Sequence, residues 1–288
     1  MLDRMAVLFQ LGKGGLSLFV VMTTLVGFVV ASRGGIAWPN LLVTMIGTGL
    51  TSWGALALNQ WWEVARDAAM RRTRKRPLPS GRMAQRPALA LALLAVAVGL
   101  AVLGLRVNLM TAALGLLTVV LYILVYTPLK PHTPLCTLIG ALCGGIPPIM
   151  GWAAAAGRVE IGGWILGATL FTWQIPHFLA LAWLYREDYA RGRFRMLPVV
   201  DRSGQVTFQT VVLYILALIP MGFAVTYVGM AGLLFMFGSF VLGSAMLFLG
   251  VRLYLQRTDA NARILFFASL IYLPALFALL LADRGLGG

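Results

Sequence analysis

The residues best suited to chemistry in this chain form a regular series on one short segment. Asn59, Glu63 and Asp67 are spaced four residues apart, and each step turns a helical position by about 40°. On a helix the three side chains therefore form one stripe. Oxygen ligands in a stripe suit Mg²⁺, which takes one or two carboxylates and completes its shell with water and phosphate oxygens. The alternative is a helix end that carries solvated acids.

A group of cations follows this stripe directly. The segment holds Arg71, Arg72, Arg74, Lys75 and Arg76, and then the sequence PLPSG, which we expect to end any helix. Acids followed by cations are the arrangement that a metal-bridged diphosphate requires. Cations beside a membrane span also serve as topology signals, so this second interpretation stays open.

A second segment, residues 173–198, repeats the order of acids, cations and Leu-Pro. Glu187 and Asp188 are followed by three arginines, Arg191, Arg193 and Arg195. Positions eleven residues apart differ by only about 20° on a helix, so we expect His177 and Asp188 to share a face if Pro176 kinks the helix only above them. A lone histidine on an apolar helix is most often a hydrogen-bonded core residue. The alternatives are an axial ligand, a proton carrier or a contact for a polar substrate edge.

The elements that must position these residues are membrane spans. The 288-residue chain is 60% hydrophobic and 11% charged, which indicates a polytopic membrane protein. Its charges lie between apolar runs, so the net charge of +14 does not favour nucleic acid binding. The uncharged runs cover residues 14–32, 34–62, 87–105, 107–129, 131–157, 161–185, 203–251 and 264–282. The run 203–251 is long enough for two helices with a break near 228–232, so nine helices are predicted.

The distribution of Lys and Arg predicts the orientation. The N-terminus and the loops after the second, fourth, sixth and eighth spans hold 19 of the 23 cations. The other side holds Arg33, Arg106, Arg158 and Arg284. This asymmetry places the N-terminus in the cytoplasm and the C-terminus outside. Loops at about 66–86, 129–135 and 186–206 then lie on the cytoplasmic face, where we expect them to cap the active site.

Three segments carry a family resemblance. RDAAMRRTRKRPLPSG, YTPLKPHTPLCTLIGALCGGIPPIMGW and WQIPHFLALAWLYREDYARGRFRMLPV resemble the signature segments of the protoheme IX farnesyltransferase family, a branch of the UbiA-type intramembrane prenyltransferases. The resemblance implies an all-α, nine-helix bundle, a single domain over residues 1–288, with a central cavity open to the bilayer. It also implies Mg²⁺ and diphosphate at two acidic motifs, with Asn59, Glu63, Asp67 and Asp188 as metal ligands. Leu184 stands where the superfamily has a further Asp.

The resemblance also implies a reaction. The farnesyl group of farnesyl diphosphate would pass to a vinyl group of heme b, and water would add to give heme O, a step in heme A and terminal oxidase biogenesis. The alternative acceptor is a quinone precursor or a chlorophyll-type aromatic. We expect Asp188 or His177 to position the water.

Substrate contacts are expected from both motifs and from the aromatic residues near them. The cations would bind diphosphate or heme propionates, and the sequence does not divide them between the two. Expected contacts are Arg71, Arg72, Arg76, Lys130, Glu187, Arg191 and Arg195, with aromatic walls from Trp61, Trp62, Tyr122, Tyr126, Trp173 and Phe178.

The resemblance implies a bacterial inner-membrane protein whose product passes to a heme A synthase or an oxidase assembly partner. Two other classes of protein compete with an enzyme. A transporter would place its acids near the bilayer midplane, whereas these acids lie at the ends of spans. An assembly protein that only holds heme would show no conversion. The sequence gives no oligomeric state.

Overall fold

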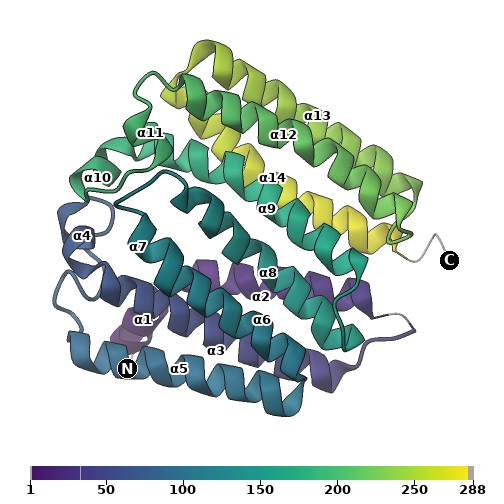
Figure 1. The fold of residues 1–288 in the computed structure, drawn as a ribbon, viewed down its shortest axis with the longest axis horizontal. Helices are drawn as coiled ribbons and strands as arrows, with labels where there is room; N and C mark the ends of the chain where they lie inside the picture. The colour runs from purple at the N-terminus through teal and green to yellow at the C-terminus, as the bar shows by residue number, and fades with distance from the viewer. Residues whose placement is uncertain (1, 33, 285–288) are drawn as a thin grey trace.

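The computed structural model describes residues 2–32 and 34–284, and every regular element in them is a helix. Nine helical spans in these residues are long and apolar enough to cross a membrane, as predicted, and they form one bundle (Figure 1). Their bounds are α2 Gly14–Ala31, α3 Trp38–Trp62, α5 Gln85–Arg106, Leu109–Leu129, α8 Cys136–Ala156, α9 Ile161–Leu184, α12 Gln205–Tyr227, α13 Leu233–Gln256 and α14 Asp259–Asp283. The predicted break at 228–232 is confirmed.

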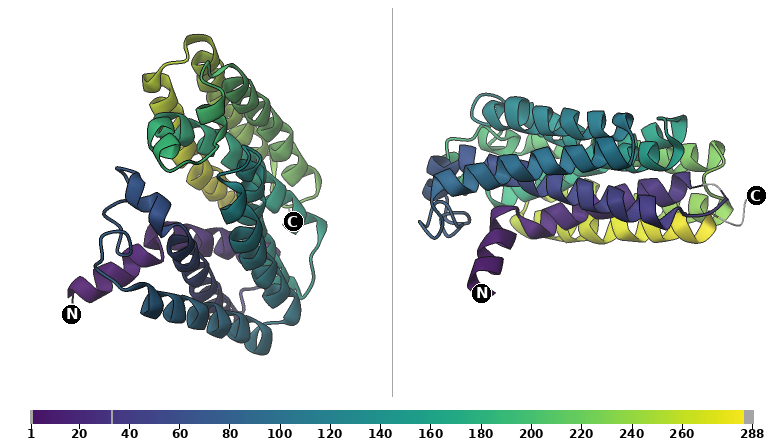
Figure 2. Two further views of the ribbon diagram at one scale, coloured as in Figure 1. Left: turned by 60° about the vertical axis from the view of Figure 1, so that its left-hand side comes forward. Right: turned by 90° about the horizontal axis from the view of Figure 1, so that it is seen from below.

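Four short helices lie outside these spans, namely α1 Leu2–Leu11, α4 Val64–Ala69, α10 Arg186–Arg191 and α11 Leu197–Val200. The helices α4, α10 and α11 gather at one end of the bundle, on the left of Figure 1, and Figure 2 shows α1 at the same end. The predicted capping loops therefore meet at one end. Arg33, which the charge count assigns to the other side, lies outside the described residues.

Small residues bring the central helices into close contact. A Cβ atom at Gly27 of α2 would overlap the carbonyl of Pro148 in α8, and one at Gly151 of α8 would overlap the carbonyl of Thr24. Close backbone contact of this kind is the usual way in which helices associate in a membrane, where apolar side chains gain little from leaving lipid. Only glycine fits at these two positions, so α2 and α8 form a fixed wall.

Helical geometry is interrupted at the end of the bundle where α4 and α10 lie. The fourth span comprises α6 Leu109–Val120, a π-helix Leu121–Tyr126 and α7 Thr127–Leu129; π-helical turns often occur at functional sites. The span α9 ends at Leu184, and the chain restarts as α10. His177 and Asp188 therefore lie on different helices, α9 and α10, and not on one continuous helix.

Candidate active site

The predicted stripe of Asn59, Glu63 and Asp67, which we call the acid stripe, is present, and it continues across a helix break. Glu63 lies between α3 and α4, but its N–H still donates to the Asn59 carbonyl at 3.0 Å, and the Asp67 N–H donates to the Glu63 carbonyl at 2.8 Å. The spacing of one helical turn is thereby kept. All three side chains are buried, with exposures of 0%, 4% and 1%.

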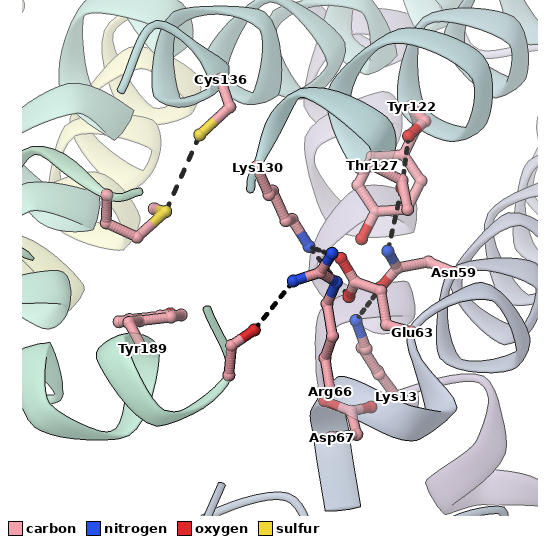
Figure 3. A network of polar contacts seen from close by, with 12 residues as sticks. Lys13, Asn59, Glu63, Arg66, Asp67, Tyr122, Thr127, Lys130, Cys136 and Tyr189 are labelled. Carbon is pink, nitrogen blue, oxygen red and sulfur yellow. Dashed lines mark hydrogen bonds and ion pairs between the residues drawn. The ribbon is translucent and has the colours of Figure 1, made fainter. Parts of the chain in front are cut away.

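Asn59 is held by hydrogen bonds at both ends of its amide. Its Oδ1 accepts from Lys13 Nζ at 2.6 Å, and its Nδ2 donates to Thr127 Oγ1 at 2.9 Å (Figure 3). The Thr127 hydroxyl donates in turn to the carbonyl of Tyr122 at 2.8 Å, within the π-helix. Asn59 thus joins the second and fourth spans to the chain before α2.

Glu63 forms a buried ion pair with Lys130. The ammonium lies 2.8 Å from Oε1 and donates a hydrogen bond to Oε2 at 3.1 Å. Burial alone would lower the pKa of Lys130, but the adjacent Glu63 carboxylate outweighs this effect and raises it. Lys130 therefore stays cationic. Its ammonium also lies 4.4 Å from the ring centre of Tyr126.

Asp67 is paired on one side only. Its Oδ2 accepts from Arg76 Nη1 at 2.7 Å, whereas Oδ1 is buried with no hydrogen-bond partner in the described chain. A buried carboxylate oxygen is costly to leave unpartnered. Arg66 does not supply a partner, because its guanidinium donates to the carbonyls of Gly192 and Arg193.

These side chains open into a cavity of about 980 Å³ of empty space, which we call the polar chamber. The predicted contact residues in its lining are Glu63, Asp67, Arg72, Arg76, Tyr122, Tyr126, Lys130 and Phe178. Arg72 is held over the rings of Tyr185 and Tyr189, at 4.8 and 5.6 Å. Lys13 lines the chamber as well, so two acids and four cations face one space, a combination suited to a metal ion bound with a polyanion.

A second cavity, of about 1210 Å³ of empty space, continues from the polar chamber into the bundle, and we call it the deep chamber. The two share Leu16, Tyr122, Gly140 and Phe178 in their linings. Trp173 and His177 line the deep chamber. Trp61 and Trp62 line neither chamber.

Asp188 lies apart from both linings. Its Oδ1 accepts from the Arg71 N–H at 3.2 Å and from Arg191 Nη1 at 3.0 Å, and its Oδ2 accepts from the Arg72 N–H at 2.9 Å. Burial opposes ionisation, but these backbone and guanidinium donors lower the pKa of Asp188 overall. The carboxylate ties α10 to the cationic loop after α4.

The remaining predicted contacts are exposed. Glu187 and Arg191 form an exposed ion pair at 3.5 Å, and the side chains of Arg71 and Arg195 lie on the surface. Arg195 contributes its backbone, since its N–H donates to the Lys130 carbonyl at 2.8 Å. The structure thus gathers half of the predicted basic residues in the polar chamber and places the others around it.

Lys13 is the charged residue in the lining of the polar chamber that the sequence analysis did not predict. It adopts a left-handed backbone conformation, with φ of 47°, directly before α2, and its side chain lines the polar chamber. Burial, together with the charges of Arg76 and Lys130, lowers the pKa of Lys13 well below its usual range. A lysine just before an apolar span reads as a topology signal, and only the packing of the first two spans reveals its contact with Asn59.

Comparisons with a family model and with curated proteins both relate this chain to prenyltransferases. The UbiA prenyltransferase family matches residues 20–271. A protoheme IX farnesyltransferase of Solibacter usitatus (strain Ellin6076) is 41% identical, over 96% of this chain and 97% of that protein.

Solved structures share the fold at low sequence identity. A digeranylgeranylglyceryl phosphate synthase structure matches with a TM-score of 0.82 at 13% identity, over 98% of this chain and 99% of that one. A UbiA homolog from Archaeoglobus fulgidus, bound to GPP and Mg²⁺, matches with a TM-score of 0.65 at 12% identity, over 95% and 99%. The chain is an integral membrane protein that belongs to the UbiA prenyltransferase family, in its protoheme IX farnesyltransferase branch.

Proposed function

We propose that this protein transfers the farnesyl group of farnesyl diphosphate to a vinyl group of heme b, with addition of water, to give heme O. The observation that carries the proposal is the pair of buried acids, Glu63 and Asp67, which share the polar chamber with four cations at the mouth of an apolar chamber. The relative from Solibacter usitatus, named protoheme IX farnesyltransferase and matched over nearly its whole length, supports heme as the acceptor over a quinone precursor.

Glu63 and Asp67 are the residues we assign to Mg²⁺. The fit rests on the buried, unpartnered Oδ1 of Asp67 and on a donor set made of carboxylate oxygens. Asn59 can contribute Oδ1 if Lys13 turns to the substrate. When bound, Mg²⁺ would offset the negative charge that develops on the departing diphosphate. We assign Asp188 to positioning the cationic loop, because its oxygens bind the N–H groups of that loop.

The cations of the polar chamber would bind the diphosphate oxygens. Arg72, Arg76 and Lys130 line the chamber together with Lys13. Each already has a fixed geometry, through an ion pair, a ring contact or a hydrogen bond. Donors fixed in advance stabilise a developing anion without reorganising, and this is usually the largest electrostatic term in catalysis.

The deep chamber would hold the apolar parts of both substrates. Breaking the allylic C–O bond leaves a carbocation, which the faces of Tyr122, Trp173 and Phe178 can stabilise. An apolar chamber also keeps bulk water away from this cation. Each chamber would therefore stabilise one of the two ions that form when the C–O bond breaks. The polar chamber would bind the diphosphate anion, and the deep chamber would shield the carbocation from water.

The proposal also places the protein in a bacterial inner membrane, with the polar chamber facing the cytoplasm. The loops at that end carry most of the cations, in agreement with the positive-inside rule. Because the product is a precursor of heme A, a heme A synthase or an oxidase assembly factor is the partner we expect.

The test is a transfer assay on the full chain purified in detergent. Heme b, farnesyl diphosphate and Mg²⁺ are supplied, and the extracted hemes are analysed by mass. We expect heme O. Unchanged heme, together with prenylation of a quinone precursor, would overturn the assignment in favour of the other acceptor class, and heme binding without any conversion would favour a heme-holding assembly protein.

A further inference from the structure

The deep chamber contains two polar side chains whose hydrogen-bonding capacity the fold does not use fully. Gln174 and His177 lie three residues apart on α9, so they share one helix face, and both line this chamber. Gln174 is 4% exposed, and its Oε1 has no hydrogen-bond partner among the described residues. His177 is 9% exposed and uses only Nδ1, which lies 2.8 Å from Ser269 Oγ.

Ser269 of α14 fixes which nitrogen of His177 carries the hydrogen. The Ser269 Oγ lies 2.6 Å from the carbonyl oxygen of Phe266, and a carbonyl can only accept, so the hydroxyl donates to it. The same oxygen must then accept from His177, which places the hydrogen on Nδ1. The neutral imidazole consequently keeps a free lone pair on Nε2.

Packing holds the imidazole ring in place. Trp173 and Phe266 stack on His177 with ring centres 5.0 and 4.9 Å away. Trp173 is itself fixed, because its Nε1 donates to the Ser269 carbonyl at 3.0 Å. A ring stacked on two others, and hydrogen-bonded at one nitrogen, presents its other nitrogen in a defined direction.

The helix α8 leaves space for the side chain of Gln174 at the chamber wall. A Cβ atom at Gly144 of α8 would overlap the Gln174 amide, so glycine at this position makes room for it. The amide lies beside Gly144 of α8, and its Oε1 has no hydrogen-bond partner within the described chain. Burial of an unpartnered amide is costly, which indicates that a ligand of the chamber completes its bonding.

We propose that Gln174 Oε1 and His177 Nε2 hold the single water that adds to the prenylated heme. This inference rests on the proposed function. A water needs at least two polar partners in a buried site. When both partners are acceptors, the water donates both hydrogens and keeps its lone pairs free, which is the orientation for attack on a cation.

The step balances without any further reagent. The allylic C–O bond breaks and diphosphate leaves with the electron pair, and the farnesyl carbon then bonds to the terminal carbon of the vinyl group. The positive charge moves to the carbon beside the porphyrin. The water oxygen bonds to this carbon, and one water proton passes to His177 Nε2. His177 is thus a catalytic residue and Ser269 a positioning residue. Asp188 does not line this chamber.

The test compares products rather than rates. The purified full chain is supplied with farnesyl diphosphate, heme b and Mg²⁺ in water labelled with a heavy oxygen isotope. The masses of the extracted hemes are then determined by mass spectrometry. The wild type is expected to incorporate the label as a hydroxyl group. Gln174→Met has a similar shape but lacks the amide, and His177→Phe lacks the ring nitrogens. Both are expected to raise the share of dehydrated farnesylated heme at least about tenfold, a conservative bound because general-base catalysis typically contributes about a hundredfold or more.

Two further variants distinguish this role from a structural one. Ser269→Ala keeps the hydrogen bond from Trp173 to the main-chain carbonyl but removes the hydroxyl that holds the hydrogen on His177 Nδ1. The share of dehydrated product is expected to rise, but less than in His177→Phe. Thr118→Val is the matched control, because Thr118 lines the same chamber while its hydroxyl already donates to the Leu114 carbonyl. Its product ratio should stay at the wild-type value.

The outcomes distinguish failure of the water site from failure of the proposed function. If Gln174→Met and Ser269→Ala both make farnesylated heme with the wild-type share of hydroxyl product, the water site is overturned and the proposed function stands. If the wild-type chain makes no farnesylated heme, the proposed function and this inference fall together.

Discussion

The Nζ atom of Lys13 lies 2.6 Å from Oδ1 of Asn59, and this contact joins the segment before α2 to the end of α3 (Figure 3). Asn59 is fully buried and donates from the other end of its amide to Thr127. A cation is thereby held beside the acid stripe, where a diphosphate would compete with Asn59 for its ammonium. The contact defines one edge of the polar chamber.

The lowered pKa of Lys13 predicts a pH-dependent affinity for the diphosphate. The side chain loses its charge at a pH below the ordinary lysine value of about 10.4, because burial and neighbouring cations disfavour the ammonium. The KM for farnesyl diphosphate should rise as pH increases, and the rise should be complete below the pH at which an ordinary lysine loses its charge. Lys13→Arg keeps the charge and should flatten this rise. Parallel profiles in the two proteins would rule out Lys13 as the titrating group.

Arg76 is predicted to bind diphosphate, whereas Arg74 is not. Arg76 lines the polar chamber and pairs with Asp67, while Arg74 is exposed outside its lining. A hydrogen bond to a charged group contributes about 1.5–3 kcal/mol, so Arg76→Gln should raise the KM for farnesyl diphosphate by roughly ten- to a hundredfold. The matched variant Arg74→Gln should stay within about twofold of wild type in steady-state kinetics. Equal effects of the two substitutions would show that only overall charge matters.

Removing Lys130 is predicted to lower the thermal stability of the protein, and removing the charge of Glu63 as well is predicted to restore part of it. Lys130→Met leaves the Glu63 carboxylate buried without its cation, and breaking a buried pair in this way costs about 3–5 kcal/mol. Thermal unfolding of metal-free protein in detergent should show a clear loss. Adding Glu63→Gln to this variant should recover part of it, because the buried charge is removed. Additive losses in the double variant would indicate that the two side chains do not interact.

Asp188 predicts how the cationic loop responds to acid. Its pKa is lowered in the folded protein, so its stabilising effect is present at neutral pH and is lost as pH falls through that lowered value, below about 4. Limited proteolysis of the loop at residues 70–84 should therefore increase steeply in acid. In Asp188→Asn the loop should be cut faster already at neutral pH and with less change between about pH 5 and 3. An acid response in the variant as steep as in wild type would contradict this assignment.

The sequence predicts the number of spans well, because each falls in an apolar run of about 20 residues or more and charged or turn-forming residues separate these runs. The acid stripe is likewise predictable, since its spacing matches one helical turn. The position of Asp188 outside both chambers is not, because it depends on hydrogen bonds to the N–H groups of Arg71 and Arg72, which lie far away in the sequence. Nor does local pattern reveal the π-helix that holds Thr127 against Asn59, or the contact of Lys13 with that residue, since both depend on packing between distant spans.

The most direct test of the central claim is the metal dependence of transfer by the purified chain. Farnesyl transfer to heme b is measured against Mg²⁺ concentration after chelation, in wild type, Asp67→Asn and Glu63→Gln. We expect no transfer in chelator, recovery with added Mg²⁺, and a loss of at least about a hundredfold in each variant at saturating metal. Undiminished turnover in chelator, or wild-type rates in both variants, would contradict a metal-held diphosphate at this acid stripe.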